Sequence, residues 1–115
     1  MSVKLATRQF GDVIIVDVAG RITLDGGSVS VRDKIQELMA AGYTKVILHL
    51  ADTSYVDSSG IGTLISGFRE LEKLGGGFKL LAPTEQVRGI FQINRLHTEL
   101  ETFYDETAAV RSFAE

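Results

Sequence analysis

Apolar and polar residues switch between two periodicities along this chain, and the switches outline its secondary structure. Two short β-prone runs, residues 3–10 and 13–18, are separated by the turn formers Gly11 and Asp12, which predicts an antiparallel hairpin. A polar, glycine-bearing loop over residues 20–27 follows. Apolar residues then recur at helical spacing up to a stop at Gly42. We expect this helix to start near Gly27 or Ser28 and to bury Val29, Val31, Ile35, Leu38 and Met39.

The second half of the chain repeats a strand–helix–strand order. Residues 45–50 form an apolar run typical of a buried strand, and a helix starting near Ser58 carries one apolar stripe, made of Ile61, Leu64, Ile65, Phe68, Leu71 and Leu74. Three glycines then precede a strand at residues 78–81. Strands joined by a crossover helix lie parallel.

The remaining residues predict a further helix, a short strand and a last helix. The helix starts at Pro83 and directs Val87, Ile90, Phe91 and Ile93 inward; the strand lies around residues 100–103 and the last helix around 105–113. The predicted fold class is therefore α/β, with one domain over residues 1–115. Its mixed sheet of four to five strands begins with the antiparallel hairpin, continues with β-α-β units and is flanked by about four helices.

Composition narrows the classes of function. A chain of 115 residues can bury a full core as one domain, and the absence of cysteine removes disulfides, thiolate metal sites and thiol catalysis. The net charge of −3 is spread without a basic stripe, so no direct nucleic-acid binding is expected. No apolar run approaches the ~18 residues of a membrane span, and no signal-peptide core follows the N-terminus. We expect a cytoplasmic protein that inserts into no membrane and whose partners are proteins.

Candidate catalytic residues are scarce. No convergent set of nucleophile, base and metal ligands is visible, so we expect no catalytic residue, no metal and no cofactor. His49 lies inside an apolar strand, which favours a hydrogen-bonded structural role. Gly60 and Gly62 partly match a dinucleotide-binding loop, but Ile65 stands where the third glycine is needed. These glycines better suit close packing of a helix on the sheet, and a nucleotide-binding module is the weaker alternative.

The most informative stretch is residues 55–65, which joins the end of a strand to the start of a helix through two hydroxyls and two glycines. Asp57, Ser58 and Ser59 fall where backbone N–H groups have no intrahelical acceptor and the helix dipole is positive. Oxygen-rich side chains or a phosphate group are favoured there. Ser58 therefore either caps the helix, which is worth ~0.5–2 kcal/mol, or accepts a phosphate.

The local string D-S-S-G-I-G at residues 57–62, preceded by L-H-L at 48–50, resembles the signature of the STAS domain in bacterial anti-anti-sigma factors. The likeness covers nearly the entire chain, from V-A-G at 18–20 to the helix around 87–91. It implies partner switching: the unmodified protein binds a serine kinase that doubles as an anti-sigma factor, and a sigma factor is released. Phosphorylation ends this binding, and a serine phosphatase restores it. ATP would be bound by the kinase, and this chain would itself be no enzyme.

The resemblance also implies which residues carry the switch. The acceptor is the serine directly after the aspartate, here Ser58. The neighbouring Asp57, Ser59 and Gly60 would belong to the surface that the kinase holds.

One position departs from the family. Many members have an acidic residue three positions after the equivalent of Gly20, in a loop that contacts the kinase, and here that position is Thr23. Asp25 either substitutes for it as a kinase contact or serves as a turn residue or helix cap. This departure leaves open a related output, a response-regulator cascade. Separately, STAS-like domains also serve as accessory subunits of membrane transport systems, and that role stays open as well.

Overall fold

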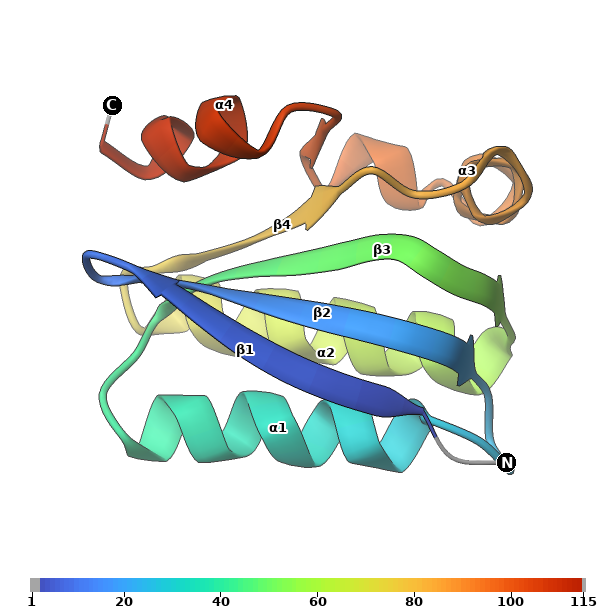
Figure 1. Cartoon of the computed structure of the whole chain (residues 1–115). Helices are drawn as coiled ribbons and strands as arrows, with labels where there is room; N and C mark the ends of the chain where they lie inside the picture. Colours follow the sequence, from blue (N-terminus) through green and yellow to red (C-terminus); the bar gives the residue numbers. More distant parts are fainter. Residues whose placement is uncertain (1–2, 115) are drawn as a thin grey trace.

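A five-stranded sheet runs through the middle of the molecule, with helices on both of its faces (Figure 1). The computed structural model describes residues 3–114 of the chain. β1 pairs antiparallel with β2, and all other neighbouring strands are parallel. The strands lie in sequence order: β1 (Lys4–Phe10), β2 (Val13–Ile22), β3 (Lys45–Val56), β4 (Gly77–Leu81) and β5 (Thr102–Phe103).

The helices are divided unequally between the two faces of the sheet. α1 (Ser28–Ala40), α2 (Ser58–Lys73) and α3 (Glu85–Ile93) bury residues in one core cluster, and α4 (Glu106–Arg111) covers part of the opposite face. In Figure 1, α2 runs behind the strands and α1 lies below it. Short 3-10 turns follow α3 and α4, at Leu96–Thr98 and Ser112–Ala114. The predicted fold class, with its N-terminal hairpin, β-α-β units and flanking helices, is confirmed.

The core is divided between the two faces because β2 and β3 are apolar on both. Val16 and Leu48, like their neighbours two residues away, point to α1 and α2 and join the larger buried cluster. Ile15 and Ile47 point to the opposite face, where Ala109 of α4 covers them. Strands buried on both faces read as continuous apolar runs, which is why the pattern of residues 13–18 and 45–50 was informative.

Both central strands extend further than their apolar runs. β2 continues to Ile22, and β3 continues to Val56, directly before Asp57. Their added residues pair with each other through two register shifts, so backbone hydrogen bonding extends the strands where the side-chain pattern is irregular. The consequence is that residues 57–60 start at the carboxyl ends of β2 and β3.

Three apolar residues expected to be buried are exposed. Val29 is 47% exposed because Ser28 takes the inward position at the start of α1, and Ile93 is 83% exposed at the last residue of α3. Leu74 lies past the end of α2 and is also exposed. The helical spacing was right at these places, but the stripe stops where each helix ends.

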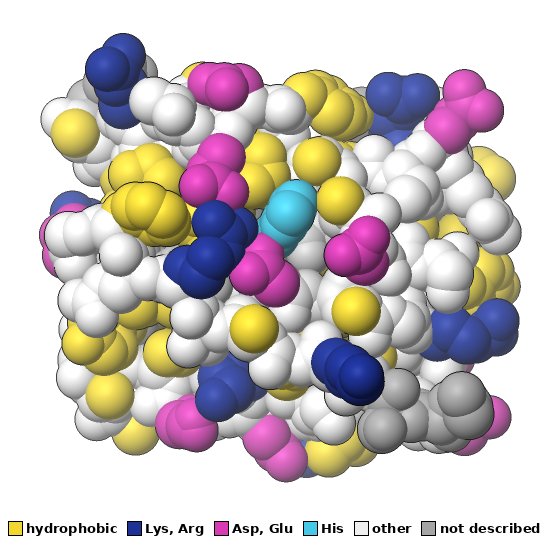
Figure 2. All heavy atoms as spheres, viewed as in Figure 1, with side chains coloured by type: hydrophobic (Ala, Val, Ile, Leu, Met, Phe, Trp, Pro, Cys, Tyr) yellow, Lys and Arg dark blue, Asp and Glu magenta, His cyan; other side chains and the backbone are white. Residues whose placement is uncertain are grey.

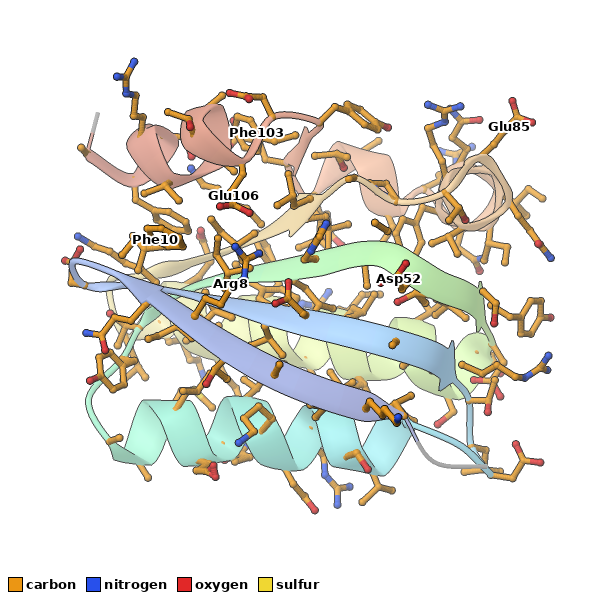
Figure 3. All side chains as sticks on the ribbon, viewed as in Figure 1. Arg8, Phe10, Asp52, Glu85, Phe103 and Glu106 are labelled. Atoms are coloured by element: carbon orange, nitrogen blue, oxygen red, sulfur yellow. The ribbon has the colours of Figure 1, made fainter. Side chains whose placement is uncertain are left out.

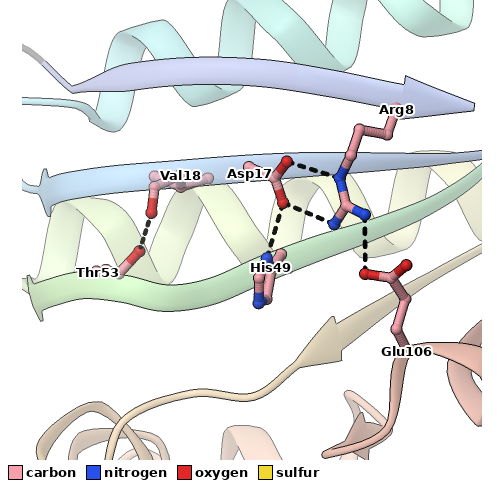
Figure 4. A network of polar contacts seen from close by, with 6 residues as sticks. All are labelled: Arg8, Asp17, Val18, His49, Thr53 and Glu106. Atoms are coloured by element: carbon pink, nitrogen blue, oxygen red, sulfur yellow. Dashed lines mark hydrogen bonds and ion pairs between the residues drawn. The ribbon is translucent and has the colours of Figure 1, made fainter.

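A polar network occupies the uncovered middle of the sheet face that α4 partly covers (Figures 2 and 4). Figure 2 shows a histidine there among acidic and basic side chains. Arg8 donates from Nε and Nη2 to the two carboxylate oxygens of Asp17, at 2.8 and 2.9 Å, and His49 Nδ1 lies 2.7 Å from Asp17 Oδ1. Glu106 points from α4 toward Arg8 (Figure 3), and their charged groups are 2.9 Å apart. The structural role predicted for His49 is confirmed.

This network predicts a pH-dependent contribution to stability. The hydrogen bond from Arg8 holds the pKa of Asp17 below its ordinary value, against partial desolvation. A lowered native pKa means that the stabilisation is present above the unfolded pKa of ~4 and is lost as pH falls through the native value. We expect Asp17→Asn to lower the free energy of unfolding by about 1 kcal/mol at pH 7. Urea unfolding at several pH values should show this difference shrinking toward pH 3, and a constant difference would contradict the assignment.

Candidate functional site

The stretch singled out by the sequence lies at the carboxyl ends of β2 and β3, at the right-hand side of Figure 1. Asp57 is the N-cap of α2, with an extended backbone, and Ser58 is the first helical residue. The loop between β2 and α1 reaches the same place. Two segments distant in sequence therefore meet around the start of one helix of 16 residues: the end of β2 with the loop after it, and the end of β3.

Asp57 ties these segments together. Its Oδ1 accepts a hydrogen bond from the Gly60 N–H at 2.9 Å, which caps α2, and its Oδ2 accepts one from the Leu24 N–H in the loop at 3.0 Å. Desolvation raises the pKa of this carboxyl, but the backbone N–H groups of Gly60, Leu24 and Ser59 outweigh it and leave the pKa below its ordinary value. The side chain is thus an anion at neutral pH.

The two adjacent serines have opposite environments. Ser59 Oγ donates to Ser28 Oγ at 2.9 Å, and Ser28, which is 3% exposed, also bonds the Ser59 carbonyl and Thr63 Oγ1. Ser58 is exposed, and its hydroxyl makes no hydrogen bond within residues 3–114. The hydroxyl open to solvent and to an approaching enzyme is therefore that of Ser58. The sequence did not predict that Ser28 accepts the hydrogen bond from Ser59, because a buried hydroxyl at a helix start has no distinct sequence pattern.

The loop residues differ from expectation. Thr23 occupies the loop position that contacts the kinase in many family members, but here its side chain is 3% exposed and its Oγ1 donates to Asp25 Oδ1 at 3.0 Å. Asp25 is exposed, and its bond with Thr23 fits the predicted turn role. The N-cap residue of α1 is Gly27, not Asp25.

Leu24 is a feature of the site that the sequence pattern did not reveal. Its side chain is 75% exposed, although its N–H is held by Asp57. A single leucine in a polar loop has no periodic signal. The hydrogen bond from the Leu24 N–H to Asp57 fixes the loop, and with it Leu24, beside the start of α2.

The two glycines of the motif, Gly60 and Gly62, differ in their structural roles. A side chain at Gly60 would overlap the Ile22 carbonyl oxygen and approach the Val56 side chain, so this glycine lets α2 pack on the strand ends, as predicted. Gly62 is exposed and a Cβ there would meet nothing within 4 Å, so the packing role predicted for it is wrong. A glycine inside a helix is less stable than alanine by about 0.5–1 kcal/mol.

Among residues 3–114, with the His97 side chain left aside, no three histidine, aspartate or glutamate side chains gather closely enough to hold a metal ion. None of the helices in that range is both long and apolar enough to span a membrane.

The chain belongs to the STAS family: the STAS domain profile matches residues 4–109. Two relatives cover most of it. The anti-sigma F factor antagonist of Lysinibacillus sphaericus is 37% identical over 81% of this chain and 77% of its own length. The anti-sigma-B factor antagonist of Bacillus subtilis is 31% identical over 84% of this chain and 86% of its own length.

Solved structures show the same fold. The crystal structure of a putative anti-sigma factor antagonist from Thermotoga maritima gives a TM-score of 0.89 at 20% identity, over 96% of this chain and 95% of that one. Phosphorylated SpoIIAA from Bacillus gives 0.72 at 25% identity, over 95% and 99%. The murine Slc26a9 anion transporter gives 0.77 at 20% identity, over 93% of this chain and 18% of the transporter.

The two roles of Asp57, charge and cap, can be separated. We expect Asp57→Ala to lower the free energy of unfolding by about 1 kcal/mol at pH 7. Asp57→Asn keeps one oxygen for the Gly60 N–H but loses the charge and the acceptor of the Leu24 N–H, so it should lower the free energy of unfolding by less than Asp57→Ala does. Because the native pKa of Asp57 is lowered, its charge stabilises above the ordinary pKa, and this part is lost as pH falls through the native value. Chemical denaturation should therefore show less loss of stability on acidification for Asp57→Asn than for wild type. Equal stability of Asp57→Ala and wild type would contradict the capping role.

Proposed function

We propose that this protein is an anti-sigma factor antagonist that acts by partner switching. In its unphosphorylated form it binds an anti-sigma serine kinase in the cytoplasm and thereby releases a sigma factor. Phosphorylation of Ser58 ends this binding, and a serine phosphatase reverses it. The kinase binds ATP, and this chain contributes a docking surface and an acceptor rather than catalysis.

The observation that carries the proposal is the exposed Ser58 hydroxyl, which has no hydrogen bond within the described part of the chain. A kinase must reach the acceptor oxygen, and transfer to Ser58 breaks no interaction inside the domain. Ser59, in contrast, would have to leave its bond with the buried Ser28. The names of the two bacterial relatives support the same role.

The physics of a phosphate at this position supports a switch without refolding. Phosphorylation adds about −1.5 to −2 charges at neutral pH. The first turn of α2 offers N–H groups and a positive dipole end that offset part of this charge within the domain. A partner surface fitted to a neutral hydroxyl, beside the anionic Asp57, would instead face an unmatched anion, at a cost of several kcal/mol. The phosphorylated SpoIIAA structure, which has this fold, is consistent with that account.

A role as a module of a transport system is supported less well. The likeness to the anion transporter lies at 20% identity, so it speaks for the fold alone. A transporter module would need no acceptor serine. Here Ser59 is hydrogen-bonded to Ser28, whereas the neighbouring Ser58 is exposed. A response-regulator cascade would use the same acceptor, Ser58, and would differ in the partner protein that binds the unphosphorylated form.

Substitution of the acceptor tests the proposal. We expect Ser58→Asp, which mimics the added charge, to weaken binding to the anti-sigma serine kinase of the same genome by about 100-fold. Ser58→Ala should bind like wild type and accept no phosphate. Titration calorimetry with the purified kinase gives the three affinities, and their equality would count decisively against the switch.

The choice between the serines can be tested by locating the phosphate. After incubation with the kinase, ATP and Mg²⁺, peptide mass spectrometry should find phosphate on Ser58 in wild type and in Ser59→Ala. Ser58→Ala should carry none. Phosphate on Ser59 in the wild-type protein would refute the assignment.

A further inference from the structure

The exposed side of α2 continues from Ser58 as a narrow strip. Residues three and four positions apart in a helix lie on one face, and this strip consists of Ser58, Gly62, Ile65, Ser66 and Arg69. A shallow hollow of about 340 Å³ lies along it, with Gly62 at the end nearer Ser58 and Lys73 at the far end.

Gly62 has no role inside the domain that explains it. Gly60, two residues earlier, is required because any side chain would strike the backbone of β2, but a Cβ at Gly62 would stand in open space. A glycine at an exposed helical position lowers helix stability. Since Gly62 lies one turn beyond Ser58, its lack of a side chain leaves the helix backbone accessible next to the acceptor.

The far end of the strip is basic. Arg69 and Lys73 are exposed and have no ion pair, hydrogen bond or ring contact within residues 3–114. Lys34, on the neighbouring α1, is in contrast paired with Glu37 at 2.8 Å. Glu70 also lines the hollow, and its carboxylate accepts a hydrogen bond from Gln36 of α1 at 2.8 Å. The two cations outnumber this carboxylate and complement an acidic surface.

We propose that the anti-sigma serine kinase packs its surface directly over Gly62, with acidic side chains beside Arg69 and Lys73. This inference rests on the proposed function, because it names the surface through which the same partner reaches Ser58. The missing side chain at Gly62 sets how closely the kinase approaches, and the basic end sets its orientation along the helix.

The decisive substitution is Gly62→Ala, which adds one methyl group to the strip. Overpacking a close interface in this way should weaken binding to the purified kinase by about 10-fold, while thermal unfolding shifts to a higher temperature. Gly89→Ala is the matched control: Gly89 is also helical, a Cβ there would also meet nothing within 4 Å, and it lies in a different helix, α3, outside the strip. It should raise stability and leave kinase affinity unchanged.

A second pair of matched variants tests the basic end of the strip. Arg69→Glu should weaken kinase binding, chiefly through slower association, and the loss should shrink at high salt. Arg111→Glu reverses the charge of an exposed arginine on α4 and should have no such effect.

Measuring these variants beside Ser58→Asp separates the two proposals. Loss of affinity in Gly62→Ala but not in Gly89→Ala supports the strip. Wild-type affinity in Gly62→Ala, together with lost affinity in Ser58→Asp, overturns the strip and leaves partner switching intact. A wild-type protein that neither binds the kinase nor is phosphorylated by it overturns both.

Discussion

The bonds of the Asp57 carboxylate are the constraint on which the site depends. One oxygen holds the Gly60 N–H and fixes the first turn of α2, and the other holds the Leu24 N–H and fixes the preceding loop. With both oxygens engaged, the backbone on either side of Ser58 is set. The Ser58 hydroxyl then faces outward, while the neighbouring Ser59 hydroxyl is bonded to the buried Ser28. One carboxylate thus organises a helix start, a loop and an exposed serine hydroxyl.

The rest of the fold keeps that arrangement rigid. β2 and β3 are buried on both faces, and Gly60 allows α2 to contact their ends directly. On the sheet face opposite α2, Arg8 and Asp17 join β1 and β2, and Glu106 links α4 to the same cluster. In the proposed switch, a phosphate on Ser58 would stand at the surface of this frame, so its physical effect would fall on the partner's surface rather than on the core.

Much of the fold could be predicted from residue patterns, because the buried central strands read as continuous apolar runs and the helices have an apolar period of 3.6 residues. The patterns failed where backbone pairing or a single contact determines the structure. β3 continues six residues beyond Leu50 because these residues pair with β2. Val29 and Ile93, near the ends of their helices, are exposed. At the site, the position of Ser58 followed from the motif. The burial of Thr23 and the exposure of Leu24 did not, because both depend on loop hydrogen bonds that have no sequence period.

The central claim is that the neutral hydroxyl of Ser58 is accepted at the docking surface and its phosphate ester is not. The most direct measurement is the affinity of one kinase preparation for the same wild-type protein before phosphorylation, after stoichiometric phosphorylation, and again after phosphatase treatment. The account predicts tight binding, a loss of about 100-fold, and full recovery. Equal affinity in all three states would contradict it.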